Sequence, residues 1–145
     1  MTEAIVVDAS TALKWVLDEE HSDAARALLD DALTGRGSLA APALLAGEAT
    51  NALYQRQRRK LLTRGEADRA LATLLASPIR FVDLDNLHTR AMTLAQEHAL
   101  PSTYDAQYLV VARALGAEFW TADVRLYNAV SRSLRWVRRI SDYGT

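Results

Sequence analysis

The sequence contains no cysteine, and this absence removes several classes of chemistry. Disulfide bonds, thiol nucleophiles and thiolate metal sites are excluded, and the composition is compatible with a reducing cytoplasm. No apolar run approaches the roughly 20 residues that span a bilayer. The N-terminus also lacks the basic segment and apolar core of a signal peptide. We therefore expect a cytoplasmic protein with no membrane partner.

The chain has no excess of charge of one sign, because 17 basic residues face 18 acidic ones. Its overall charge therefore does not demand a nucleic-acid partner. With 145 residues, half of them apolar, the chain is long enough for one hydrophobic core. No internal repeat, low-complexity tract or linker divides it. The sequence predicts a single domain over residues 1–145.

Strand-like and helical segments alternate along the chain, which favours an α/β domain with a mainly parallel sheet. A capping box at Thr63–Glu66 starts one of the helices, and Ser77-Pro78 ends it. Pro42 is suited to the first position of another helix, and Gly116 to the C-terminal stop of a third. The predicted strands are 4–7, 38–41, 79–84, 118–121 and 134–140, and the other predicted helices are 11–17, 22–33, 42–60, 86–99, 103–115 and 124–131.

Four acidic residues occupy positions where secondary structure alone does not require them. Asp8 and Asp123 each end an apolar run, Asp105 follows a proline-containing break, and Glu48 lies in an apolar helical stripe. The carboxyl ends of parallel strands and the starts of the helices that follow share one side of a sheet. We therefore expect the four carboxylates to converge.

Convergent carboxylates repel one another, so their pKa values rise unless a cation neutralises them. Ligation by oxygen alone, without cysteine, selects Mg²⁺ or Mn²⁺ rather than zinc or copper. Such a site polarises a phosphodiester and activates water, and two ions could clamp the attacking and leaving oxygens. The pattern thus favours metal-assisted hydrolysis of a phosphodiester.

Each acid also has a structural interpretation. Asp8 and Asp123 could cap the helices that follow them, and Asp105 could pair with Ser102 in a capping box. Glu48 is harder to explain in this way, because glutamate is rarely buried without a partner. Asn51, one helical turn further on, could orient Glu48 or a metal-bound water. The structural alternative for Glu48 is an ion pair with an arginine from another helix.

At these residues the sequence resembles PIN-domain proteins, specifically the VapC-type toxins of type II toxin–antitoxin pairs. The resemblance covers nearly the whole chain in order. It rests on VVDASTALKW (6–15), APALLAGEATNAL (41–53), STYDAQYLVVA (102–112) and TAD (121–123).

The resemblance implies a three-layer α/β/α PIN-like fold and an endoribonuclease dependent on Mg²⁺ or Mn²⁺. It also implies a VapB-type antitoxin as a partner and favours a homodimer. Carried over to this chain, the catalytic and metal-binding residues are Asp8, Glu48, Asp105 and Asp123. Asp8 and Asp105 are the principal metal ligands in this interpretation, and the reaction is a hydrolysis without a covalent intermediate. Ser10 and Thr121 match hydroxyl positions of the family and either support a ligand or serve as turn and cap residues.

RNA approaching an acidic site needs positive charge around it. One basic cluster comprises Arg56, Arg58, Arg59 and Lys60, with Arg64 nearby. A second comprises Arg132, Arg135, Arg138 and Arg139. Either cluster could hold phosphates, and either could be an ordinary solvated surface.

Other nucleotide-binding and phosphoryl-transfer classes fit the sequence poorly. Gly35-Arg36-Gly37 lacks the third glycine of a dinucleotide-binding motif and precedes a strand rather than following one. A P-loop is absent from the sequence. Two alternatives stay open: a non-catalytic PIN-fold module that binds protein or RNA, and a nuclease that acts on DNA.

Overall fold

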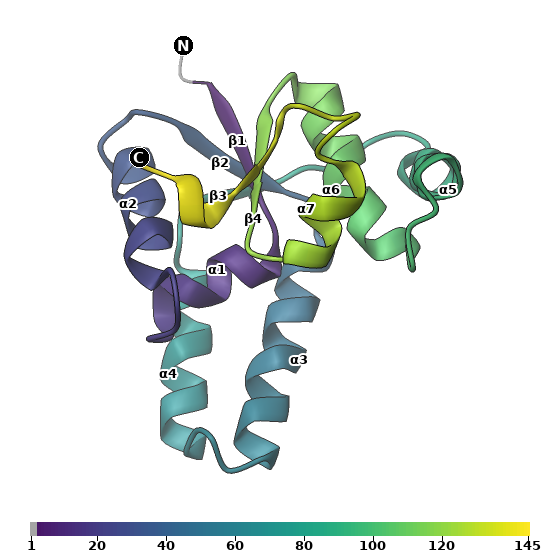
Figure 1. Cartoon of the computed structure of the whole chain (residues 1–145). Helices are drawn as coiled ribbons and strands as arrows, with labels where there is room; N and C mark the ends of the chain where they lie inside the picture. Colours follow the sequence, from purple (N-terminus) through teal and green to yellow (C-terminus); the bar gives the residue numbers. More distant parts are fainter. Residues whose placement is uncertain (1–2) are drawn as a thin grey trace.

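The computed structural model describes residues 3–145 and is built around a sheet of five parallel strands (Figure 1). The strand order is β3-β2-β1-β4-β5, and every pairing between neighbours is parallel. The predicted α/β class with a mainly parallel sheet is confirmed. The strands are β1 Ala4–Val7, β2 Ser38–Ala41, β3 Ile79–Phe81, β4 Glu118–Thr121 and β5 Val137–Arg139.

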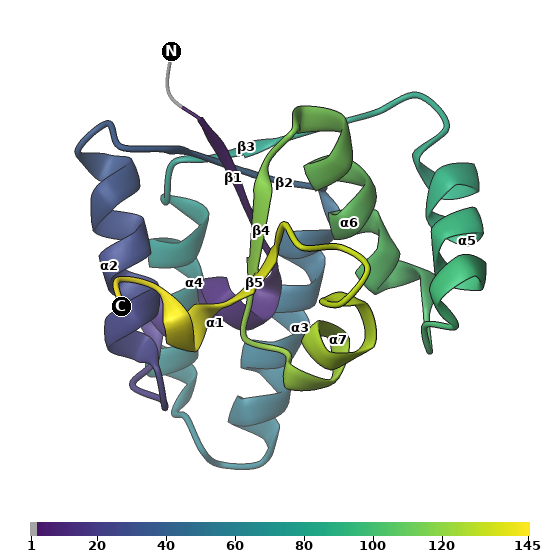
Figure 2. The same cartoon turned by 45° about the horizontal axis from the view of Figure 1, so that its top comes forward.

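Helices cover both faces of the sheet, as the three-layer prediction requires. Figure 2 shows α2 and α4 to one side and α5 and α6 to the other. Helix α1 packs against α2, α3 and α4, and α5 packs along α6. None of the helices in residues 3–145 is long and apolar enough to cross a membrane. The helices are α1 Ala9–Val16, α2 Ser22–Leu33, α3 Leu44–Arg58, α4 Arg64–Leu75, α5 Leu87–His98, α6 Thr103–Leu115 and α7 Val124–Val130, followed by the 3₁₀ turn η1 Ile140–Asp142.

Helices α3 and α4 form a hairpin that projects from the body of the molecule (Figure 1). The Thr63–Glu66 capping box starts α4 as predicted, with both of its hydrogen bonds formed. Lys60 adopts a left-handed backbone conformation in the turn between the two helices. The hairpin thus carries the end of α3, and the basic residues there, away from the sheet.

Several predicted helix and strand ends differ from the observed ones by up to three residues. Helix α3 begins at Leu44 rather than at Pro42, because its first turn is closed by tight bonds from the Leu45 and Ala46 amides to carbonyls three residues back. Strand β3 stops at Phe81. The last strand is limited to Val137–Arg139, because the preceding residues turn back onto Val130 through backbone hydrogen bonds.

The central strands are apolar because helices bury both of their faces. Val6 and Val7 in β1 and Phe119 in β4 are fully shielded from solvent. The Phe119 ring stacks on Tyr108 of α6, with 5.8 Å between ring centroids. This packing fixes α6 against the strands whose ends carry acidic residues.

We predict that Phe119→Ala lowers the free energy of unfolding by about 3–5 kcal/mol, because it removes a buried ring and leaves a cavity. Phe81→Ala is the matched control, since Phe81 is 45% exposed at the edge of the same sheet. Its expected cost is about 1 kcal/mol or less. Urea denaturation measures both values, and equal losses would contradict the assignment of Phe119 to the core.

Candidate active site

The order of the strands reverses next to β1. The chain passes from β1 to β2 and β3 on one side and then returns to β4 on the other side of β1. In open α/β sheets, ligands bind outside the carboxyl ends of the strands at such a switch point. Asp8 directly follows β1, and Asp123 lies just beyond the end of β4. Two of the predicted site residues therefore flank the place where a ligand site is expected.

Asp8 is held by a network that joins the ends of β1 and β4. Its Oδ1 accepts hydrogen bonds from Ser10 Oγ at 2.6 Å and from the Thr11 amide at 3.1 Å. Its Oδ2 accepts from Thr121 Oγ1 at 2.5 Å. The Ser10 hydroxyl accepts in turn from the Ala122 amide, and the Thr121 hydroxyl accepts from the Asp123 amide. Both hydroxyls thus link Asp8 to the backbone of the β4–α7 connection.

Burial dominates the electrostatics of Asp8. The residue is 6% exposed, and desolvation raises its pKa from 3.8 to about 6. The hydrogen bonds from Ser10, Thr121 and Thr11 favour the charged form and oppose this rise, whereas repulsion from Asp123 adds to it. Burial therefore disfavours the charged form of Asp8, and three hydrogen-bond donors offset part of that cost.

Glu48 lies in the first half of α3 and meets Tyr108 of α6. The Tyr108 hydroxyl donates a hydrogen bond of 2.5 Å to Glu48 Oε1. Tyr108 is 1% exposed, and burial followed by the Glu48 contact raises its pKa far above the usual range. The phenol therefore stays protonated and acts as a permanent donor that fixes the Glu48 carboxylate. The arginine ion pair considered for Glu48 does not form among residues 3–145.

Asp105 occupies the first turn of α6 and is half-buried. Burial raises its pKa to about 6, and repulsion from Asp123 and Glu48 adds to the rise, while Arg125 opposes it. The alternative role in a capping box is absent, because the Ser102 side chain makes no cap hydrogen bond. Asp105 is thus electrostatically coupled to two other predicted site residues.

Asp8 and Asp123 also cap helices, as their structural interpretations propose. Asp8 caps α1 through the Thr11 amide, and Asp123 caps α7 by accepting from the Leu126 amide. Each carboxylate uses one oxygen for its cap. The structural and the functional interpretations are therefore compatible. A residue that follows a strand of this sheet can both cap the next helix and lie beside the other acids.

The donor chemistry of the four acids suits a hard divalent cation. All donors are oxygens, and repulsion couples Asp8 to Asp123 and Asp105 to both Asp123 and Glu48. Within residues 3–145, no three side chains of metal-ligating type already stand at ligand distance from a common point. Asp8, Glu48 and Asp123 are instead turned toward hydrogen-bond donors of the protein.

Asn51 and most of the first basic cluster lie away from the acids. The exposed Asn51 side chain accepts a hydrogen bond of 3.4 Å from Gln55 rather than contacting Glu48. Arg58, Arg59 and Lys60 are exposed near the end of α3, about 15 Å along the helix axis from Glu48. The structure therefore does not bring these residues together with the four acids.

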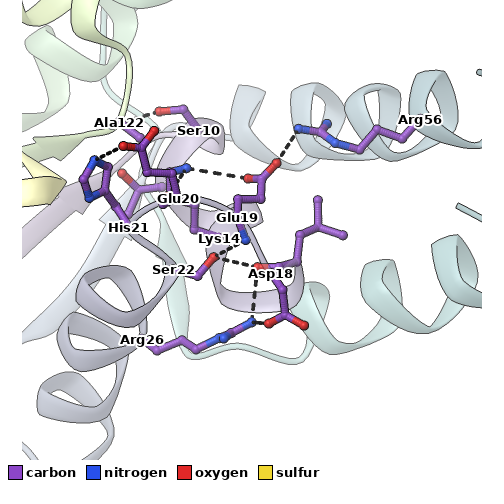
Figure 3. Close-up of polar contacts among 12 residues, drawn as sticks. Ser10, Lys14, Asp18, Glu19, Glu20, His21, Ser22, Arg26, Arg56 and Ala122 are labelled. Carbon is purple, nitrogen blue, oxygen red and sulfur yellow. Dashed lines mark hydrogen bonds and ion pairs between the residues drawn. The ribbon is translucent and has the colours of Figure 1, made fainter. Parts of the chain in front are cut away.

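Arg56 is engaged in an ion-pair network (Figure 3). Its guanidinium lies 3.1 Å from Glu19, whose other oxygen lies 3.7 Å from the Lys14 ammonium. Lys14 also donates to the Glu20 carbonyl at 2.7 Å. Figure 3 shows Ser10, one turn before Lys14 on α1, beside this group. The network ties α3 to the loop between α1 and α2.

The second basic cluster is partly engaged as well. Arg138 pairs with Glu118 and lies over the Trp120 ring, and Arg139 pairs with Asp142 and lies over Tyr127. Arg132 and Arg135 are exposed. The RNA-binding role of either cluster stays a prediction.

The sequence and the fold were compared with known proteins. A protein-family model for the PIN domain matches residues 5–131. The chain belongs to the PIN domain family. No curated protein sequence gives a significant match.

Two solved structures resemble this PIN domain in fold. One is PAE2754 from Pyrobaculum aerophilum, with a TM-score of 0.72, 23% sequence identity and coverage of 97% of this chain and 93% of that one. The other is VapC20 from Mycobacterium tuberculosis, a toxin that cleaves the sarcin–ricin loop. Its TM-score is 0.62 at 21% identity, with coverage of 88% of this chain and 95% of that one.

Sequence reasoning did not identify the roles of Tyr108 and Arg125. Tyr108 lies three residues after Asp105 on α6, so the two side chains share one side of the helix. That spacing is a signal that could have placed a phenol beside the acids. Arg125 follows Asp123 closely, yet nothing in the sequence distinguishes it from a solvated arginine.

We predict that Thr121→Val raises the pKa of Asp8 further, because it removes a donor that stabilises the charged carboxylate. Thr50→Val is the control, since the Thr50 hydroxyl bonds only to the Ala46 carbonyl on an exposed part of α3. A carbon-detected NMR titration of the aspartate carboxyls measures the change. An unchanged Asp8 midpoint in Thr121→Val would show that the hydroxyl does not hold the carboxylate.

We also predict that Asp8 makes folding less favourable as pH rises. Its pKa in the folded chain, about 6, lies above the unfolded value of 3.8. The penalty is therefore absent below about pH 4 and complete above about pH 6, and it amounts to about 3 kcal/mol. Urea unfolding in EDTA should show a smaller decline across this window for Asp8→Asn than for the wild type. Asp23→Asn, at an exposed site on α2, should follow the wild type.

Proposed function

We propose that this PIN domain is an endoribonuclease that hydrolyses RNA phosphodiester bonds with Mg²⁺ or Mn²⁺. One observation carries the proposal. Four carboxylates gather at the switch point of the sheet, and the pKa values of Asp8 and Asp105 are raised to about 6 there. Such a repulsive cluster destabilises the fold unless it has a ligand to bind, and an oxygen-only donor set suits a hard cation.

Membership of the PIN family supports a nuclease, because proteins of this family are nucleases that generally use divalent ions. The VapC20 toxin, with its similar fold, acts on an RNA loop, and this supports RNA as the substrate class. In the proposed site, Asp8, Glu48, Asp105 and Asp123 hold the metal, with Asp8 and Asp105 as the principal ligands. An ion held there would polarise the phosphodiester and lower the pKa of the attacking water.

The remaining groups of the site act by positioning and by proton transfer. Ser10 and Thr121 orient Asp8, and Tyr108 orients Glu48. Glu48 or Asp123, which complete the metal shell directly or through water, would accept the proton of the attacking water. The product of the hydrolysis is an RNA strand cut at one phosphodiester, with no covalent enzyme intermediate.

We further propose that the protein is the toxin of a type II pair, with a VapB-type antitoxin as its partner and a homodimer as its assembly. The α3–α4 hairpin supports a protein contact. Leu61 and Leu75 on it are 69% and 53% exposed, whereas its Leu74 is buried in the core. We propose that the exposed tip of the hairpin, around Leu61, takes part in this contact.

The first test is cleavage of total RNA by purified wild-type protein with Mg²⁺ or Mn²⁺ and again with EDTA. Asp8→Asn, purified identically, should lose activity by about a hundredfold or more, because it removes a principal ligand of the metal. EDTA should abolish cleavage. Asp23→Asn is the matched control, because it makes the same exchange on the surface of α2 and should leave the rate unchanged.

The alternatives appear as distinct outcomes of the same experiment. Equal cleavage by wild type and Asp8→Asn would identify a contaminant. Cleavage of single-stranded DNA in preference to RNA would assign the activity to DNA. Metal binding by calorimetry without cleavage of any nucleic acid would favour the non-catalytic module.

A further inference from the structure

A cavity opens beside the acidic site, between the α5–α6 loop and α7. Its volume is about 430 Å³, within the range of about 300–1,000 Å³ that is usual for small-molecule sites. Asp105 and Asp123 are part of its lining. The cavity is therefore continuous with the predicted catalytic carboxylates. The other lining residues are Ala99, Leu100, Pro101, Arg125, Leu126 and Ala129.

The cavity is lined by apolar side chains and by three charged ones. The loop contributes only apolar side chains, and α7 adds Leu126 and Ala129. The charged groups are the two aspartates and Arg125. An apolar wall with a few charged groups suits a flat heterocycle that carries a charged substituent.

Arg125 supplies the positive charge. It is exposed, and it lies near enough to Asp105 to oppose the rise in that residue's pKa. It forms no salt bridge with any of residues 3–145, unlike Arg56, Arg138 and Arg139, which are paired. A guanidinium without a protein partner, beside carboxylates that would repel a polyanion, is suited to hold a phosphate.

We propose that this cavity binds the nucleoside next to the scissile phosphate of the RNA substrate, with Arg125 on the phosphate that flanks it. This inference rests on the proposed function and deepens it by naming the subsite that sets nucleotide preference. The base lies against the apolar wall, and the backbone leads to Asp105 and Asp123. Splayed, unstacked bases of this kind are the usual basis of sequence preference in RNA recognition.

The first variant fills the cavity. Ala129 is an exposed part of its lining, so Ala129→Phe occupies the space without disturbing the core. Asn128→Phe adds the same ring at the neighbouring exposed position, outside the lining. We expect Ala129→Phe to weaken kcat/KM for RNA by about tenfold or more, the value of one lost base contact. Asn128→Phe should match the wild type, and thermal denaturation should show both variants folded.

Sequencing of the cleaved RNA ends gives a second measurement. Wild type and Asn128→Phe should share one nucleotide preference beside the cut, and Ala129→Phe should lose it. Identical preferences and rates in all three proteins would overturn the proposal while leaving the nuclease intact. If Ala129→Phe cut RNA normally but no longer bound its antitoxin, the cavity would belong to the protein partner, and the proposal would be wrong.

The proposed contact between Arg125 and a phosphate is tested by measuring RNA binding. In the Asp8→Asn background, a labelled single-stranded RNA is titrated at several salt concentrations and followed by fluorescence anisotropy. Arg125→Met should weaken binding and reduce the salt slope by about one contact, whereas exposed Arg132→Met, outside the cavity, should not. An unchanged slope in Arg125→Met would remove the phosphate contact from the proposal.

A measurement on the wild type separates this inference from the nuclease itself. Each of the four ribonucleoside monophosphates is added singly to methyl-labelled protein in Mg²⁺, and NMR shifts are mapped. Shifts at Leu100, Leu126 and Ala129 would support the subsite even if no RNA were cleaved, in which case only the proposed function would fail. Shifts confined to other methyl groups would reject the subsite even if RNA were cleaved.

Discussion

The cost of burying carboxylates, to which their mutual repulsion adds, is the constraint on which the site depends. The strands that run into the site are buried on both faces, and they end where Asp8 and Asp123 begin. The apolar core therefore fixes the position of charges that would otherwise move apart. The hydrogen bonds from Ser10 and Thr121 offset part of the cost of burying Asp8, but desolvation still outweighs them. Burial of the apolar core thus offsets the free energy of folding that is lost by burying Asp8.

Strand register controls the site more strictly than any single side chain does. In the β1–β4 pair, Val7 lies opposite Trp120, so Asp8 falls level with Thr121. A slip of one residue would turn Thr121 to the other face of the sheet and break its bond to Asp8. Helix α6 adds a second link, because it carries both Asp105 and the Tyr108 phenol that holds Glu48. The positions of the acids therefore depend on two contacts between elements that are distant in sequence, the β1–β4 pairing and the α3–α6 contact.

The sequence was sufficient for the parallel sheet and for the order of the elements, because buried strands and amphipathic helices have distinct periodicities. It was also sufficient to bring Asp8, Glu48, Asp105 and Asp123 to one edge, since parallel topology puts strand ends and helix starts together. The sequence was not sufficient to predict which side chains form hydrogen bonds and ion pairs with one another. Asn51 bonds within its own helix and Arg56 pairs with Glu19, because these choices depend on rotamers and on loops that periodicity does not describe. The shortened last strand was missed for the same reason.

The α3–α4 hairpin has a mechanical consequence. Helix α3 is one continuous rod of 15 residues, with Glu48 near the sheet and Arg58 near the free end. The Lys14–Glu19–Arg56 network lies between these two points and braces α3 against α1. The Arg56 ion pair and the Glu48–Tyr108 hydrogen bond therefore hold α3 at two points along its length, so a partner that breaks the first at the hairpin acts on the same helix that carries the second.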